Sequence, residues 1–418
     1  MQEHAGASTL VTPTPSTGTA RGAQPSAVRA HNLHVVLDCI VHAEPPASRA
    51  EIAALTGLGK GTVTALVDTL LRARLIRELA PVASTAVGRP SVPLAPARAT
   101  YVGLGIELAP DGVSVRAIDL AGGLIAHTTL DLDLAGSAIS GGIETIRQAV
   151  TQVVDVSTED GALVAGACVA VPAVVDEKGQ ILRSDSLRRW EGISLPAALR
   201  SADAIGDYPL HVGASASLAA TAEAALARSE HQPEQFIHVY GGLSIGASIV
   251  GDASVRPDVY GGLRELGHIS IDPRGRPCPC GRRGCLRQYA SLPALWSAAG
   301  QRGEPDGSVL LSLLESGHRA THHAVDDAGR AIARALAAPL GLLGLREVVL
   351  DGWFAHIVPF VRDGMRHEFA ELLGADPILI RGSLSGRWSV VIGAAQFALN
   401  DVFQDPGRII SDSGDEGS

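Results

Sequence analysis

One histidine and three cysteines are the side chains with the clearest capacity for chemistry. Cys278, Cys280 and Cys285 lie within eight residues of one another, and His268 lies ten residues upstream. One imidazole and three thiolates make a complete tetrahedral ligand set for zinc, with no open position for a substrate. Two glycines inside the loop let it fold back so that the three sulfur atoms converge. The spacing therefore predicts a structural zinc site.

A disulfide bond or unpaired core thiols are the alternative for these cysteines. Cys278 and Cys280 are two positions apart. In an extended segment such side chains point the same way, and their Cα atoms lie near the upper limit for a disulfide. We therefore expect zinc here, and a thiolate site also favours a reducing compartment.

Residues 28–78 show three short helical patterns. Ser48 and Glu51 have the spacing of a capping box, which opens the second and shortest helix. Gly57 then turns the chain, and a third helix from about Lys60 carries apolar residues at helical spacing. Two helices joined by a tight glycine turn indicate a helix-turn-helix.

A β-hairpin is expected directly after these helices, with strands at residues 75–79 and 91–94 and Arg89 at its tip. The order of elements predicts a winged helix-turn-helix domain over residues 28–94. In such a domain the N-terminal end of the third helix enters the major groove, and an arginine on the hairpin can enter the minor groove. A solvated hairpin tip is the alternative for Arg89. The residues expected to face double-stranded DNA are Gly59, Lys60, Gly61, Thr62, Thr64 and Arg89.

Length and charge suggest that the chain has unlike parts. Its 418 residues are enough for two or three domains, and its net charge of −10 excludes a surface that is basic throughout. Residues 28–92 hold seven Arg and Lys against five Asp and Glu. Residues 1–27, rich in Thr, Pro, Ser, Ala and Gly, are expected to form a disordered arm. No apolar run reaches the ~18–20 residues of a membrane span and no secretory signal is recognisable, so we expect a cytoplasmic protein without a membrane partner.

From Tyr101 the pattern changes to alternating strands and helices. Three β-rich runs lead into a helix and a buried strand at residues 163–171. Residues 324–402 alternate again and end with a helix expected over residues 391–402. This α/β pattern, repeated twice, predicts two lobes with a cleft between them over residues 100–404. Residues 405–418 are expected to be a flexible acidic tail.

The chain resembles the ROK family, which contains transcriptional repressors and sugar kinases. The resemblance rests on Glu265-x-Gly267-His268, on the Cys-x-Cys-Gly-x-x-Gly-Cys loop, and on the winged module in front. It covers residues 28 to about 403. It implies a two-lobed actin-like (ribonuclease-H-like) ATPase fold with a zinc loop, and the N-terminal module points to the repressor branch.

Three departures from the family's kinase pattern argue against catalysis. Where its kinases place a Gly-Gly-Thr-Lys turn, residues 106–111 read Ile-Glu-Leu-Ala-Pro-Asp, with a carboxylate that would face a phosphate and a proline that lacks an amide donor. The second phosphate loop, at residues 242–248, keeps only some of its glycines. The position of the catalytic aspartate is Ser215, beside Ala214, and a serine hydroxyl cannot act as a base near pH 7 without a partner. We therefore expect no ATP cofactor and no enzymatic activity.

The resemblance also implies which residues contact a ligand. Glu265 and His268 match the family's sugar-contacting pair, Ser215 lies at the position of the catalytic aspartate, and Arg287 replaces a further acidic residue. This arginine either favours a ligand with a carboxylate or phosphate, such as a sugar acid, or faces solvent beside a partly vestigial pocket.

The sequence thus predicts a DNA-binding transcriptional regulator, most simply a repressor, whose operator binding is controlled by a sugar or sugar derivative in a kinase-like cleft. A homodimer or higher homo-oligomer is expected, because one module offers few DNA contacts. The alternatives are a sugar kinase that retains ATP-dependent phosphorylation, a regulator without a small-molecule effector, and a zinc-responsive regulator. The last is disfavoured, because a closed four-ligand site holds its metal tightly.

Overall fold

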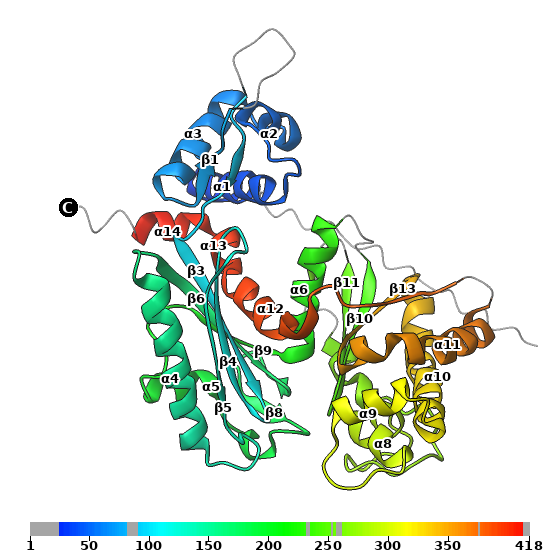
Figure 1. Cartoon of the computed structure of the whole chain (residues 1–418). Coiled ribbons are helices and arrows are strands. Elements are labelled where there is room, and N and C mark those ends of the chain that lie inside the picture. Colours follow the sequence, from blue (N-terminus) through cyan, green and yellow to red (C-terminus); the bar gives the residue numbers. More distant parts are fainter. Residues whose placement is uncertain are drawn as a thin grey trace, which may run out of the picture.

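A computed structural model of the chain describes residues 25–81, 91–230, 235–251, 254–255, 261–374 and 377–412. The chain has a small helical module at the N-terminus and two α/β lobes, and the module sits on the first lobe (Figure 1). Within these described ranges, no helix is long and apolar enough to cross a membrane.

The N-terminal module has three helices and a two-stranded antiparallel hairpin. They are α1 (Pro25–His42), α2 (Arg49–Thr56), α3 (Lys60–Arg72), β1 (Ile76–Glu78) and β2 (Leu94–Pro96). The capping box is present, and the Ser48 N–H donates to Glu51 at 2.8 Å. Gly57 ends α2 in the left-handed region, at φ +71°. The buried residues of α3 begin at Val63, and the residues before it in the first turn are exposed to solvent.

Two expectations for this region are corrected. Helix α1 begins at Pro25, within the stretch expected to be a disordered arm. The second hairpin strand begins at Leu94, where the expected strand ended. The Pro93 carbonyl oxygen accepts from the Leu79 N–H, but Pro93 has no N–H to donate in return, so the ladder with β1 stops at Leu94. The expected hairpin tip with Arg89 lies outside the described residues.

Lobe one is built on a five-stranded sheet with the order β5-β4-β3-β6-β9. Strands β3, β4 and β5 are antiparallel, whereas β6 and β9 run parallel to β3. Helix α4 covers one face of this sheet. The elements of the lobe are β3 (Tyr101–Ala109), β4 (Gly112–Asp119), β5 (Leu124–Asp131), α4 (Ile139–Thr158), β6 (Leu163–Val171), β7 (Val174–Val175), β8 (Ile181–Arg183), the 3₁₀ helix η1 (Arg188–Trp190), α5 (Leu195–Ser201) and β9 (Leu210–Ala214).

Lobe two repeats this arrangement in the order β12-β11-β10-β13-β14, with β10, β11 and β12 antiparallel and β13 and β14 parallel to β10. Helices α10 and α11 cover its outer face (Figure 1). Its strands are β10 (Phe236–Gly241), β11 (Ile245–Gly251), β12 (Ser254–Val255), β13 (Glu347–Gly352) and β14 (Leu379–Gly382). Its helices are η2 (Gly261–His268), α7 (Arg287–Ala290), α8 (Leu292–Ala298), α9 (Gly307–Glu315), α10 (Arg319–Leu343) and α11 (Trp353–Leu373).

Two helices fill the space between the sheets. Helix α6 (Ser215–Ser229) packs on lobe two, whereas α12 (Ser389–Ala398), which follows η3 (Gly386–Trp388), packs on lobe one. The two helices cross in close contact, because a Cβ at Gly393 would lie 1.7 Å from the Leu218 carbonyl oxygen. This crossing joins the lobes.

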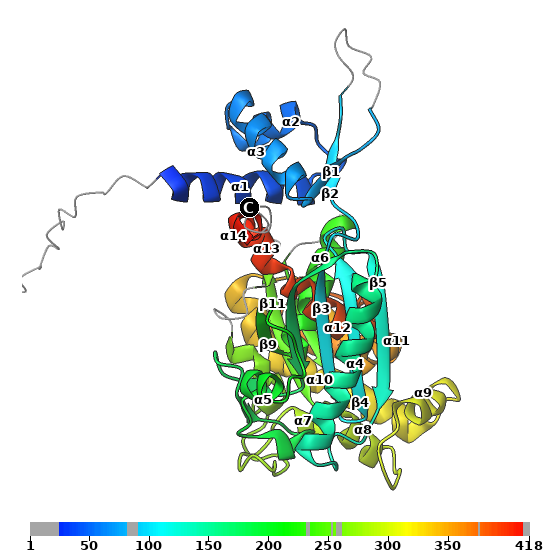
Figure 2. The same cartoon turned by 90° about the vertical axis from the view of Figure 1, so that its left-hand side faces the viewer.

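The C-terminal segment differs from expectation in two ways. The helix expected over residues 391–402 is divided into α12 and α13 (Asn400–Gln404). Part of the stretch expected to be a flexible tail forms α14 (Pro406–Asp412), which lies beneath α1 (Figure 2), and the remainder of that stretch lies outside the described residues. Ile409 and Ile410 pack against the core of the N-terminal module, and their burial accounts for the ordered helix.

The helix crossing predicts that Gly393→Ala destabilises the protein by roughly 2–3 kcal/mol, because a methyl group would force the two backbones apart. Gly141→Ala in α4 is the control, since nothing lies within 4 Å of that Cβ position, and it should change stability by less than about 1 kcal/mol. Urea unfolding of both variants measures the difference. Equal stability of the two variants would contradict the packing described.

Candidate metal centre and ligand cleft

The structure brings the four predicted metal ligands together. One ligand atom from each of His268, Cys278, Cys280 and Cys285 lies within 4.8 Å of all the others. The Cys280 and Cys285 sulfur atoms are 3.6 Å apart, and His268 Nδ1 is 3.8 Å from the Cys278 sulfur. Tetrahedral zinc with ordinary bond lengths needs S···S and N···S separations of about 3.8 and 3.6 Å. The four side chains therefore fit a metal ion of that size.

The loop between the cysteines owes its shape to two glycines. Gly281 and Gly284 have φ values of +86° and +66°. A Cβ at Gly284 would lie 1.7 Å from the Asp272 carbonyl oxygen, so no larger residue fits there. The Cys278 N–H donates to Arg282 at 2.9 Å and closes the turn. All five cysteines of the chain are free thiols, so the disulfide alternative is not observed.

The thiols differ in how readily they ionise. Burial opposes ionisation of Cys280, but hydrogen bonds from the backbone and side chain of Arg282 outweigh it and lower the pKa of this thiol to about 6. Burial and the neighbouring sulfur atoms raise the pKa of Cys285 to about 12. A bound cation would hold the thiols as thiolates, so metal binding would release protons.

His268 also belongs to the boundary between the lobes. Its Nε2 lies 3.3 Å from Asp185, which follows β8 in lobe one. Arg287 of α7 pairs with the same carboxylate at 2.7 Å, and Arg183 pairs with Glu265. Burial opposes ionisation of Asp185, but the hydrogen bond to His268 and the charge of Arg287 outweigh it and lower its pKa. The metal loop thus faces a band of paired charges across the cleft.

The outcome for the expected ligand residues is mixed. Glu265, His268 and Arg287 lie together, whereas no hydrogen bond or ion pair among the described residues joins Ser215 to them. Ser215 is buried at the start of α6. Arg287 does not face solvent, since only 14% of its side chain is exposed, and Asp185 already balances its charge.

Sequence reasoning missed Arg183 and Asp185. They lie 82 and 83 positions from Glu265 and His268, and β8, which ends at Arg183, has only three residues. The one available signal was the opposite charges of Arg183 and Asp185, two positions apart, directly after the apolar pair Ile181-Leu182.

The region of the expected first phosphate loop is acidic. Burial and the charges of Asp111 and Asp351 raise the pKa of Glu107, near the end of β3, to about 7. Pro110 and Asp111 form the short turn to β4, as the strand bounds show. On the facing strand β10, Tyr240 packs against Gly352, where a Cβ would meet its ring at 3.1 Å. These groups offer carboxylates and an aromatic ring where a nucleotide phosphate would need donors.

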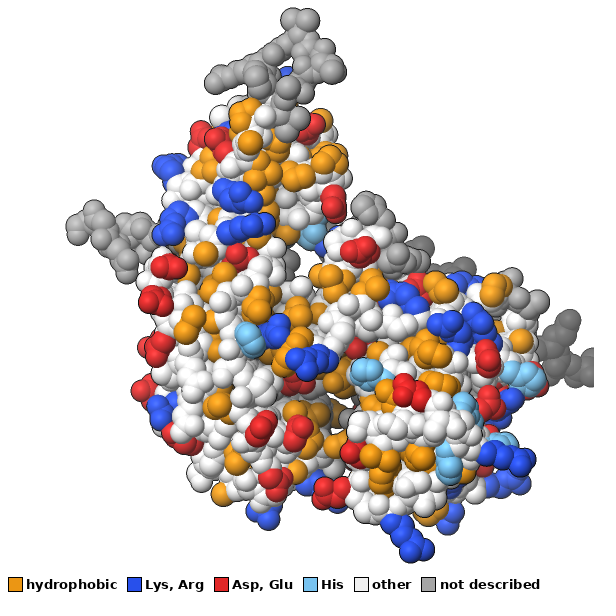
Figure 3. Space-filling view, viewed as in Figure 1, with side chains coloured by type: hydrophobic (Ala, Val, Ile, Leu, Met, Phe, Trp, Pro, Cys, Tyr) orange, Lys and Arg blue, Asp and Glu red, His pale blue; other side chains and the backbone are white. Residues whose placement is uncertain are grey.

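The five described residues expected to contact DNA are all solvent-exposed. They are Gly59, Lys60, Gly61, Thr62 and Thr64, on the cap and first turns of α3. Lys and Arg side chains lie on the side of the module that carries α3 (Figure 3). The surface is available for contact with a partner.

The N-terminal module shares an apolar core with the edge of lobe one and with α12 and α13. The Tyr101 hydroxyl, at the start of β3, donates to the Ala73 carbonyl oxygen after α3 at 3.2 Å. His34 Nδ1 of α1 lies 2.7 Å from the Phe403 carbonyl oxygen of α13. The N-terminal module is therefore fixed to the two-lobed region at two points, the start of β3 and α13.

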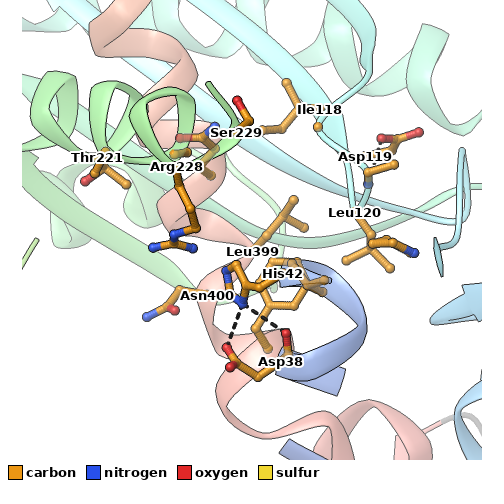
Figure 4. A pocket seen from close by; sticks show the side chains of 18 of the residues that line it. Asp38, His42, Ile118, Asp119, Leu120, Thr221, Arg228, Ser229, Leu399 and Asn400 are labelled. Atoms are coloured by element: carbon orange, nitrogen blue, oxygen red, sulfur yellow. Dashed lines mark hydrogen bonds and ion pairs between the residues drawn. The ribbon is translucent and has the colours of Figure 1, made fainter. Parts of the chain in front are cut away.

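A cavity of about 770 Å³ opens beside this junction, with walls from α1, the β4–β5 turn, α6 and the α12–α13 segment. Figure 4 shows Arg228 reaching it from α6, and Asp38 and His42 of α1 paired at 3.1 Å. The hydrogen bond to His42 is the main cause of the lowered pKa of Asp38. Changes in the placement of the interlobe helices would alter this cavity and the seat of the N-terminal module together.

Two protein families match parts of the chain. Residues 140–400 match the ROK family, and residues 33–80 match the IclR helix-turn-helix domain. The chain is 26% identical to the xylose repressor of Bacillus subtilis (strain 168) over 327 residues, which cover 77% of this chain and 82% of that protein. It is 27% identical to the kanosamine kinase of Amycolatopsis mediterranei (strain S699) over 234 residues, which cover 55% of this chain and 75% of the kinase. Repressors and kinases are thus both among its relatives.

Solved structures share the fold. A ROK family transcriptional regulator, a homologue of the Escherichia coli Mlc protein, superposes with a TM-score of 0.76 at 19% identity, covering 92% of this chain and 99% of the other. A ROK family glucokinase from Streptomyces griseus, solved with glucose and AMPPNP, superposes with a TM-score of 0.59 at 20% identity, covering 72% of this chain and 99% of the kinase. The expected fold class, a helix-turn-helix in front of a two-lobed actin-like domain, is confirmed. The match over residues 140–400 spans more than half of the sequence, and the chain belongs to the ROK family.

Proposed function

We propose that this ROK family member is a DNA-binding transcriptional regulator, most simply a repressor, whose operator binding is controlled by a small ligand in the interlobe cleft. The observation that carries the proposal is a helix-turn-helix with an exposed α3 start, packed on the ROK domain through a shared core. Relatives named as repressors support it. A sugar or sugar derivative is the proposed effector class, because polar side chains of both signs surround the cleft.

The proposed DNA contacts follow from the burial of α3. With Val63, Leu66 and Val67 in the core, the opposite face and the first turn of α3 are free to enter the major groove. Lys60 and Thr62 are proposed to contact phosphates, which position the helix without reading sequence. Arg89 remains a proposed minor-groove contact.

The helices between the lobes are the proposed route from cleft to DNA. Helix α12 packs on lobe one and on α6, and it leads through α13 to the contact with α1. A change in the angle between the lobes would move α6 against α12. Such a movement would shift the surface of α12 and α13 on which the N-terminal module packs.

We propose a dimer that binds two half-sites, because one helix-turn-helix offers few base contacts. We also propose the domain limits expected from the sequence, 28–94 for the DNA-binding domain and 100–404 for the ligand domain, adjusted to include β2 up to Pro96. A DNA-binding role and thiolate ligands both suit the cytoplasm.

Zinc is the proposed occupant of the His268 and cysteine site, in a structural role. Three thiolates and one imidazole leave no coordination position for a substrate. Bound zinc would order the loop and fix the His268 ring for the cleft. A zinc-responsive regulator is less well supported, because a closed site exchanges its metal slowly.

The DNA assignment predicts that Lys60→Ala weakens binding of a selected operator fragment and lowers the slope of log Kd against log salt by about one unit. Lys178→Ala is the matched control, because Lys178 is an exposed lysine in lobe one, remote from α3. Fluorescence anisotropy at several salt concentrations measures both effects. The same loss in both variants, or in neither, would remove α3 as the contact helix. Arg89→Ala belongs in the same series, and unchanged affinity at two salt concentrations would reject its proposed role.

The metal assignment predicts that Cys280→Ser loses most of its bound zinc, because serine is a poor ligand in a thiolate set. Cys39→Ser in α1 should keep the full metal content, since Cys39 is not part of the cluster. Elemental analysis of the purified variants measures the number of zinc ions per chain. We expect one in Cys39→Ser and far less than one in Cys280→Ser. Equal metal content in the two variants would reject the site.

If the protein were a sugar kinase, it would convert ATP to ADP in the presence of its sugar. We expect no such turnover. Glu107 and Asp111 occupy the expected phosphate turn, and Ser215 occupies the position of the base. Incubation with ATP, Mg²⁺ and a panel of hexoses, pentoses and amino sugars should give ADP at the rate of the sugar-free control. The Streptomyces griseus glucokinase serves as the positive control. Sugar-dependent release of more than one ADP per chain would establish the kinase instead.

A further inference from the structure

We propose that Arg183 and Asp185 form a latch that closes the cleft in the absence of ligand, and that Asp185 makes the cleft select a neutral polyol over an anionic one. The proposal rests on the proposed function in one respect, since it takes this cleft to be the effector site. It concerns residues that neither the sequence motifs nor the expected ligand set included.

The latch consists of two ion pairs that cross between the lobes. Arg183 and Asp185 belong to lobe one, where the neighbouring Ile181 and Leu187 are part of the core. Their partners Glu265 and Arg287 belong to lobe two. Each lobe contributes one cation and one anion, so neither pair can form unless the lobes are together.

The two pairs differ in burial. The side chains of Asp185 and Arg287 are 20% and 14% exposed, whereas those of Arg183 and Glu265 are 39% and 34% exposed. Loss of one partner from the more buried pair leaves a charge with little water to compensate it. The outer pair is more accessible, so a ligand can displace Arg183 first.

The charges around the cleft restrict the chemistry of the ligand. A hydroxyl group both donates and accepts, so a polyol can bridge Asp185 and Arg287, or Arg183 and Glu265, without leaving either charge alone. A carboxylate or phosphate satisfies only the arginines and leaves both acids unpaired. The four paired charges sum to zero, and the additional positive charge of Arg282, 3.8 Å from Glu265, lies on a half-exposed side chain where solvent and salt screen it. The site therefore favours a neutral sugar, not the anionic ligand that Arg287 suggests by itself.

Asp185 also connects the latch to the metal loop. His268 faces the cysteines with Nδ1 and Asp185 with Nε2. The carboxylate therefore positions the ring from the cleft side while the loop holds it from the other. Movement of Asp185 toward a ligand would therefore also displace the His268 ring and disturb the metal loop.

The first test measures closure without any ligand. Arg183→Gln combined with Asp185→Asn should open the lobes and raise the radius of gyration in small-angle X-ray scattering. Arg189→Gln is the matched control, because Arg189 is exposed on η1 and has no ion-pair partner among the described residues. An unchanged radius of gyration in the double variant, with circular dichroism showing it folded, overturns the latch.

The second test measures ligand preference with glucose and glucuronate, which differ only at C6. Calorimetric titration of the wild-type protein should give tighter binding of glucose. In Asp185→Asn the Arg287 charge loses its partner, so the ratio of the two Kd values should shift toward glucuronate by about tenfold or more. A wild-type preference for glucuronate, or an unchanged ratio in the variant, overturns the selectivity. Binding of neither sugar by the wild-type protein also counts against it.

The two proposals fail separately. If the wild-type protein binds no DNA, the proposed function is wrong, but the scattering result still decides whether the latch exists. If DNA binding is found and the double variant stays closed, the latch is wrong and the regulator remains.

Discussion

The arrangement of the whole molecule depends on the crossing of α6 and α12. Each lobe has one of these helices on the inner face of its sheet, and Gly393 lets the two backbones meet at the Leu218 carbonyl. Glu223 of α6, which is fully buried, accepts hydrogen bonds from Ser383, Leu384 and Ser385, just before η3 and α12. One helix thus holds the start of the other. Since α12 also leads to the N-terminal module, any rearrangement of the lobes must pass through this contact.

The metal loop and the cleft are linked by one imidazole. A cation at the cysteines would take one ring nitrogen of His268, and Asp185 takes the other. The loop therefore has two consequences for the cleft: it fixes the direction of a polar group, and it places Arg287 two residues after Cys285, opposite lobe one. The four-residue cluster is thus also part of the boundary between the lobes, through His268.

Much of this structure could be predicted from local patterns in the sequence. The strand at residues 163–171 was predicted with its observed bounds, because a continuous apolar run that begins shortly after Gly161 and ends at Pro172 leaves little choice. The metal ligands were predicted because four side chains of unusual type lie within eighteen residues. The latch and α14 were not predictable, because both depend on partners far along the chain. Asp185 becomes a cleft residue only when lobe two faces it, and α14 becomes a helix only when α1 covers its two isoleucines. The prediction of the second hairpin strand was wrong for a local reason, since Pro93 has no N–H and the ladder with β1 therefore ends at Leu94.

The contact of α1 with the C-terminal helices has a consequence for biosynthesis. His34 and Phe403 are 369 positions apart, so their contact can form only when almost the entire chain has left the ribosome. Until then the N-terminal module lacks one of its supports, and its apolar surface on that side stays exposed to solvent. Synthesis of the segment around Phe403 is therefore also the step that allows the N-terminal module to pack fully on the rest of the molecule.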